Sequence, residues 1–164
     1  EALAYELGMA VLVEAHDATE LDLAEAYLRL QKARMEDRLD YQIEASEEAR
    51  RVGLPPLLLQ PLVENALVHG LEPQVDGGTV KVTARVEAAQ LIIEVQDNGR
   101  GHGATLPPQR QAAVGTHQNS GMALENIRAR LLARWGGAAS LQIADAKPGT
   151  RATLRIPIQD EHQS

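Results

Sequence analysis

The 164-residue chain contains no cysteine and no phenylalanine, and aromatic residues make up only 2% of it. The absence of cysteine excludes disulfides, thiolate metal sites and a cysteine nucleophile. The chain has no apolar run of the ~18 residues that a membrane-spanning helix needs, and no signal-peptide pattern opens it. Because aromatic residues are so scarce, a hydrophobic core must be built from Leu, Val, Ile and Ala.

Basic residues are outnumbered, and the formal net charge is -7. A nucleic-acid-binding protein needs a basic stripe, so we expect no nucleic-acid partner. A nucleotide ligand remains compatible, because Mg²⁺ and backbone N–H groups can meet its phosphates. The hydrophobic fraction of 44% and the charged fraction of 24% are typical of a globular domain. The length fits one such domain with a helical appendage.

Residues 1–38 are predicted to be helical. Thr19, followed three residues later by Asp22, is a plausible N-cap of a second helix in this segment. The apolar face predicted for that helix consists of Leu23, Tyr27 and Leu30. Two interpretations stay open: a helical pair that packs on the following domain, or a dimerisation or linker element.

From residue 39 the pattern becomes mixed. Alternating residues predict a short strand at 39–43, a hairpin at 79–96 and two further strands at 141–143 and 152–158. A strongly apolar helix is predicted over Leu54–Leu71, and a second over Gly121–Trp135 that is stopped by the next two glycines. Residues 99–120 lack periodicity and predict a long loop. This order predicts an α+β fold, a two-layer α/β sandwich with a mixed, mostly antiparallel sheet and helices on one face.

Strand parity draws attention to Asp97 and Thr150. Each has the parity of the apolar residues in its own strand, so both side chains are expected to face the core. A buried carboxylate costs several kcal/mol unless it is paired or hydrogen-bonded. The alternative is an Asp that turns outward in an Asp-Asn-Gly turn, which is common.

Asn65 and His69 lie one turn apart on the first apolar helix. In one interpretation the Asn is simply buried and hydrogen-bonded, and the His is favoured by the dipole at the end of the helix. In the other, Asn65 is an oxygen ligand for Mg²⁺ and His69 lies beside a bound base or ribose. Gly99 and Gly101 give the backbone freedom just after the buried aspartate. Gly121 opens a helix, where phosphate can bind.

Four segments occur in a fixed order. They are LLLQPLVENALVHG at 57–70, VQDNGRG at 95–101, SGMALENIRARL at 120–131 and PGTRATLRIP at 148–157. The series resembles the conserved boxes of the gyrase, Hsp90, histidine kinase and MutL ATPases, which have the Bergerat-type ATP-binding fold. In detail it resembles the LytS-type branch of sensor histidine kinases, whose hallmark is a LQPLVENA helix. The resemblance covers roughly residues 20–158.

The resemblance implies a role for each matching residue. Asn65 would coordinate Mg²⁺ between the phosphates, with His69 nearby. Asp97 would accept the adenine amine together with Thr150, and the loop at 102–120 would be the ATP lid. The remaining ATP-binding positions would be Gly99, Gly101, Gly121, Met122, Ala123 and Leu124.

Some positions depart from the family pattern. Pro61 stands where relatives that hydrolyse ATP place a general-base Glu, so transfer to a histidine fits better than hydrolysis. Val68 replaces a basic residue, and Ala123 replaces a glycine. The Asn-Pro-His acceptor motif is absent, because none of the histidines has that context: His16, His69, His102, His117 and His162.

The resemblance therefore implies a protein-histidine kinase domain at 39–158 that binds ATP and Mg²⁺ without a certain catalytic side chain. Residues 1–38 would be a linker or remnant of the dimerisation hairpin, and 159–164 a tail. Expected partners are a response regulator and, in the full-length protein, a second copy. This segment would be the cytoplasmic portion of a membrane-anchored bacterial protein, without direct membrane contact and unable to phosphorylate itself alone. Alternatives are a nucleotide-binding pseudokinase or an interaction module of the same fold.

Overall fold

The computed structural model describes residues 19–71, 75–99 and 119–158. Its strands are β1 (Leu39–Ala45), β2 (Gly78–Glu87), β3 (Gln90–Asp97), β4 (Ser140–Asp145) and β5 (Thr150–Pro157). Its helices are α2 (Glu20–Met35), α3 (Glu47–Arg51), α4 (Gln60–Asn65) and α6 (Asn119–Trp135). Helical turns η1 (Glu36–Arg38), η2 (Ala66–Leu71) and η3 (Gly136–Ala138) follow α2, α4 and α6.

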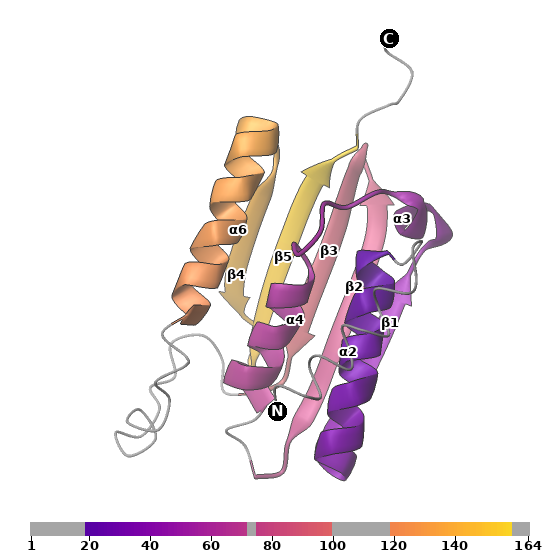
Figure 1. Cartoon of the computed structure of the whole chain (residues 1–164), viewed down its shortest axis with the longest axis vertical. Helices are drawn as coiled ribbons and strands as arrows, with labels where there is room; N and C mark the ends of the chain where they lie inside the picture. Colours follow the sequence, from indigo (N-terminus) through magenta and orange to yellow (C-terminus); the bar gives the residue numbers. More distant parts are fainter. Residues whose placement is uncertain (1–18, 72–74, 100–118, 159–164) are drawn as a thin grey trace.

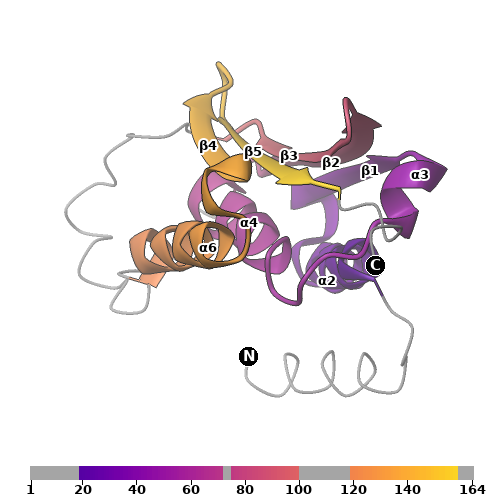
Figure 2. The same cartoon turned by 90° about the horizontal axis from the view of Figure 1, so that it is seen from above.

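The strands form one sheet in the order β1-β2-β3-β5-β4 (Figure 1). β1 pairs with β2 in parallel, and every other neighbouring pair is antiparallel. Viewed from above, α2, α4 and α6 all lie on one face of the sheet (Figure 2). The predicted two-layer sandwich with a mixed, mostly antiparallel sheet is confirmed.

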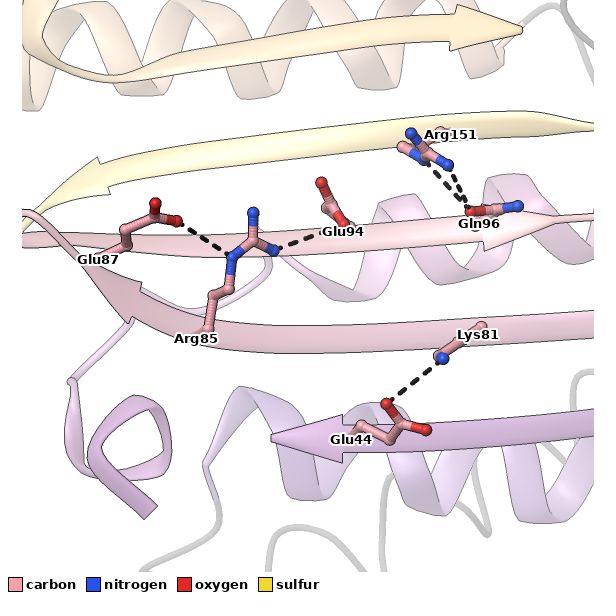
Figure 3. Close-up of polar contacts among 7 residues, drawn as sticks. All are labelled: Glu44, Lys81, Arg85, Glu87, Glu94, Gln96 and Arg151. Carbon is pink, nitrogen blue, oxygen red and sulfur yellow. Dashed lines mark hydrogen bonds and ion pairs between the residues drawn. The ribbon is translucent and has the colours of Figure 1, made fainter. Parts of the chain in front are cut away.

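The two faces of the sheet differ in chemistry. The helix-covered face buries one aliphatic core, which includes Val82, Ile93 and Leu154. The other face carries polar pairs (Figure 3), such as Lys81 with Glu44 at 3.3 Å and Arg85 with Glu94 at 3.5 Å. Exposed ion pairs contribute little to stability, so the fold depends mainly on the aliphatic layer.

α2 begins at the predicted N-cap, but the face that it buries differs from the predicted one. Thr19 Oγ1 accepts the Asp22 N–H at 3.2 Å, and the Asp22 carboxylate accepts the Thr19 N–H at 3.0 Å, a complete capping box. The predicted apolar face was wrong, because Leu30 is 47% exposed. The buried apolar positions are Leu21, Ala24, Leu28 and Met35, and Glu20 is also buried. This second stripe of aliphatic residues runs the length of the helix, whereas the predicted stripe ends at a charged residue.

The helix predicted over 54–71 begins later than expected. α4 starts at Gln60, with Pro61 in its first turn, and residues 52–59 form a loop. Leu57, directly after the Pro55-Pro56 pair, has a φ of +62°, which lies outside the helical region, so the helix cannot run on from that pair. The stretch after Asn65 continues as the π-helical turn η2. α3 was not predicted, although Ser46 caps it by accepting the Ala49 N–H at 3.1 Å.

Several predictions fall outside the described residues or are otherwise untested. The first helix of 1–38, most of the 99–120 loop and the 159–164 tail belong to the former group. α2 shares its core with the sheet. The linker or dimerisation role of 1–38 and the division at residue 39 stay predictions.

Candidate functional site

The predicted site residues that the structure describes gather at one end of the molecule. β3 ends there, the antiparallel β5 starts there, α4 ends there and α6 begins there, at the lower end in Figure 1. Asp97 follows Gln96, which pairs with Arg151, so Asp97 lies beside Thr150 in the next register position. Chain segments far apart in sequence therefore meet at this end.

Asp97 is only 4% exposed, so its predicted inward orientation is confirmed. Its Oδ1 accepts the Gly99 N–H at 2.9 Å, and the Thr150 N–H is a further donor to the carboxylate. Burial raises the pKa of Asp97 above its ordinary value, while these backbone hydrogen bonds oppose the rise. The Asp-Asn-Gly turn is also present, so the same aspartate is both buried and turn-forming.

Gly149 makes this arrangement possible. Its φ is +93°, a region that residues with a Cβ rarely adopt, and a Cβ there would collide with the Asp97 carbonyl oxygen. The close backbone approach brings the Thr150 N–H to the Asp97 carboxylate. Sequence reasoning used Thr150 and missed the need for Gly149 beside it.

Asn98 is a second residue that the sequence did not single out. Its side-chain oxygen accepts the Thr79 N–H at 2.7 Å, and its own N–H donates to the Thr79 carbonyl at 3.3 Å. A Cβ on Gly78 would collide with the Asn98 side chain. These contacts fasten the end of β3 to the start of β2, and so they hold Asp97 in place.

Asn65 is the last residue of α4 and is half-buried. Leu62 and Val63 turn to the core, and Asn65 lies on the flank of that buried stripe. Glu64 is about 100° further back around the helix, on the other flank of the stripe. Burial raises the pKa of Glu64, and its carboxylate accepts the Gln60 amide at 3.4 Å, which lowers it in part. Glu64 and Asn65 therefore leave the helix in directions about 100° apart.

The remaining predicted residues are partly described. His69 lies in η2, but its side chain is outside the described set, as is Gly101. Gly121 lies in the first turn of α6, where Met122 is 66% exposed. Ala123 and Leu124 are partly buried. The start of α6 thus reaches the same end of the sheet as Asp97.

The donor set of this end fits a magnesium nucleotide. Among the described residues no group of three His, Asp or Glu side chains converges to hold a metal by itself. Mg²⁺ usually takes few protein ligands and completes its shell with phosphate oxygens and water, so the amide oxygen of Asn65 suits it. Asp97 offers a buried acceptor for an amine, as a nucleobase presents.

A separate hollow lies between the start of α2, α3 and the 52–56 segment. Its lining includes Glu20, Arg50 and Pro56. None of the predicted site residues lines it. Within the described part of the chain, no helix is long and apolar enough to cross a membrane.

A sequence model of the histidine kinase-, DNA gyrase B-, and HSP90-like ATPases matches residues 55–160. The chain belongs to this ATPase family. It is 34% identical over 139 residues to the sensor protein LytS of Staphylococcus haemolyticus, covering 84% of the chain and 24% of the relative. It is also 34% identical over 145 residues to the sensor histidine kinase BtsS of Escherichia coli K12, covering 88% and 24%. The chain spans about a quarter of the length of these relatives.

Solved structures agree on the fold. The catalytic domain of histidine kinase ThkA superposes with a TM-score of 0.60 at 16% identity, covering 84% of this chain and 90% of that one. A blue-light activated histidine kinase of Erythrobacter litoralis gives 0.54 at 20% identity, covering 84% and 42%. The predicted fold class and the predicted membership in the LytS-like group are confirmed.

Proposed function

We propose that this chain is the ATP-binding catalytic domain of a LytS-type sensor histidine kinase. It would transfer the γ-phosphoryl group of ATP to a histidine elsewhere in the full-length protein. The observation that carries the proposal is the buried Asp97 carboxylate, set beside Thr150 at the end of the sheet in a chain of this ATPase family.

Asp97 would select adenine. An exocyclic amine donates a hydrogen bond to the carboxylate, whereas a base with a carbonyl at that position leaves the carboxylate facing another acceptor. An unsatisfied buried group costs roughly 1–3 kcal/mol, which is enough to discriminate between bases. Gly99 and Thr150 hold the carboxylate in position through their backbone N–H groups. The predicted roles of Gly101 and His69 remain part of this proposal.

Asn65 would hold Mg²⁺ through its amide oxygen. The ion supplies charge neutralisation for the phosphoryl group being transferred. The first turn of α6, which includes Gly121, would present backbone N–H groups to the phosphates, and Met122, Ala123 and Leu124 would lie beside them. Pro61 cannot act as a base for water, which favours transfer to a histidine nucleophile over hydrolysis.

The wider assignments concern the whole protein. A response regulator would receive the phosphoryl group, and the full-length protein would act as a homodimer. This domain would be the cytoplasmic portion of a membrane-anchored bacterial protein. These proposals rest on the sensor-kinase relatives, of which this chain spans about a quarter.

A calorimetric titration with Mg·ATP tests the nucleotide site. We expect wild type to bind, and Asp97→Asn to bind roughly 10–100-fold more weakly, since a hydrogen bond to a buried charged group is lost. Glu94→Gln is the matched control, because it removes a carboxylate from the polar face of the same strand. It should bind like wild type. Absence of binding to wild type would leave only the interaction-module alternative.

The stability of Asp97→Asn separates binding from folding. Burial raises the Asp97 pKa, so the ionised form is disfavoured in the folded protein, and this penalty is present at neutral pH. We therefore expect the variant to unfold at or above the wild-type temperature. If Asp97→Asn unfolds at a lower temperature than wild type, its loss of binding would instead reflect a destabilised fold.

A second candidate function, the pseudokinase, is favoured by Val68 and Ala123, which replace a cation and a glycine of the family pattern. Labelled ATP given to the full-length protein distinguishes the two. We expect label on a histidine. Measurable ATP binding without labelling would establish the pseudokinase instead.

A further inference from the structure

Arg130 of α6 reaches across to the loop that leads into α4. Its Nη1 donates to the Leu57 carbonyl at 2.9 Å, and its Nη2 donates to the Pro56 carbonyl at 2.6 Å. The guanidinium thus binds two consecutive carbonyls as a fork. Such charge-assisted hydrogen bonds are roughly twice as strong as neutral ones, and the planar fork fixes their direction.

The loop held by Arg130 contains a strained residue directly before two core residues. Leu57 has a φ of +62°, which leucine rarely adopts, and its side chain is 55% exposed. Leu58 and Leu59, which follow it, are fully buried in the core. Strained backbone persists where the surroundings fix it, and here the surroundings include the Arg130 fork.

Arg130 lies far from the nucleotide end. α4 and α6 pack against each other and run in opposite directions (Figure 1). Gly121 and Asn65 are at the end where nucleotide would bind, while Arg130 and Pro56 are at the other. At ~1.5 Å per residue, Arg130 is about 14 Å along the helix from Gly121. It cannot itself touch the phosphates.

We infer that Arg130 is a positioning residue that closes the far end of the α4–α6 pair. By fixing that end, it sets the separation between Asn65 and the first turn of α6, which are the two groups proposed to meet Mg²⁺ and phosphate. The inference rests on the proposed function. It assigns to Arg130 an effect on the Mg²⁺–phosphate half of the site, and none on the adenine half built by the strands.

The test compares two ligands by calorimetry: Mg·ATP, and adenosine, which presents the base without phosphate or Mg²⁺. Arg130→Met should weaken Mg·ATP about tenfold, the equivalent of ~1.4 kcal/mol, and change adenosine binding by less than about twofold. Arg130→Lys keeps the charge and loses the fork, so it should lose several-fold on Mg·ATP alone. Arg128→Met removes the same charge from an exposed position of the same helix and should match wild type.

A double-mutant cycle with Asn65→Ala identifies the route of the effect. If Arg130 acts through the placement of Asn65, Arg130→Met should have little further effect on Mg·ATP in the Asn65→Ala background. Additive losses would overturn the inference.

The other outcomes are equally decisive. Equal losses for both ligands would show a merely structural role and overturn the inference, as would wild-type Mg·ATP binding by Arg130→Met. If Arg130→Met fails to fold, the selective loss must appear in Arg130→Lys, and its absence there overturns the inference. Failure of wild type to bind either ligand would overturn the proposed function itself, and so is distinguished from failure of the arginine variants.

Discussion

α2 and α4 lie on the same face of one sheet and are built in opposite ways (Figure 2). α2 has 16 residues, a complete capping box, acidic residues in its first turn and basic residues in its last. α4 has 6 residues, no side-chain cap, a left-handed Leu57 before it and a π-helical turn after it. α2 follows the local rules of helix formation, whereas α4 is held by its neighbours and carries Asn65. Departures from local rules concentrate where function is expected.

The sharpest test of this comparison concerns the two faces of α2. Leu28 is fully buried in the shared core, so Leu28→Ala should lower the free energy of unfolding by about 2–5 kcal/mol. Leu30→Ala, on the exposed face, should cost less than about 1 kcal/mol. Urea unfolding of both variants measures the difference. Equal losses of unfolding free energy in the two variants would support the apolar face predicted from sequence, which includes Leu30.

A glycine substitution should act in opposite directions before α4 and within α2. Leu57→Gly relieves a positive φ at an exposed position and should leave stability unchanged or raise it by up to about 1 kcal/mol. Leu30→Gly places glycine in a regular helix and should lower stability by about 1 kcal/mol. Thermal unfolding under identical conditions compares them. A clear loss in Leu57→Gly would mean that the leucine side chain supports the loop.

The smallest expected effect concerns Glu64 on α4. Burial raises its pKa above 4.5, so its ionised form destabilises the folded state. Wild type should lose stability relative to Glu64→Gln as pH rises from about 4.5, and match it below that value. Unfolding temperatures across this range provide the measurement. A difference independent of pH would indicate the hydrogen bond to Gln60 rather than burial as the cause.

Much of the sheet could be predicted, because alternating apolar and polar residues show directly which side chains of a strand face the core. The hairpin appeared where predicted, and strand parity alone placed the Asp97 side chain inward. The start of α4 could not be predicted as well, since an apolar run does not show which proline opens a helix. The apolar face of α2 failed for a related reason: two aliphatic stripes overlapped, and only packing against the sheet selects one.

The contacts that complete the site lie beyond local patterns. Arg130 reaches carbonyls 73 and 74 residues away in the chain. Asn98 reaches back 19 residues to a backbone N–H. Both side chains bond to backbone groups, and the sequence does not show which backbone group a side chain will reach, because every residue type has one. The residues alone left the role of Asn65 and His69 open, and only the resemblance to a family assigned the LQPLVENA helix to a site.

The parallel pairing of β1 with β2 has a consequence for how the protein folds. The connection between these two strands contains α3, α4 and η2, so Asn65 is carried on a crossover. Asp97 and Thr150 meet only when β3 pairs with β5, whose connection contains α6 and β4. Closing such long connections is slow compared with forming a hairpin. We therefore expect both halves of the site to come together late in folding, so that nucleotide added to a refolding chain would capture only those molecules in which both crossings are complete.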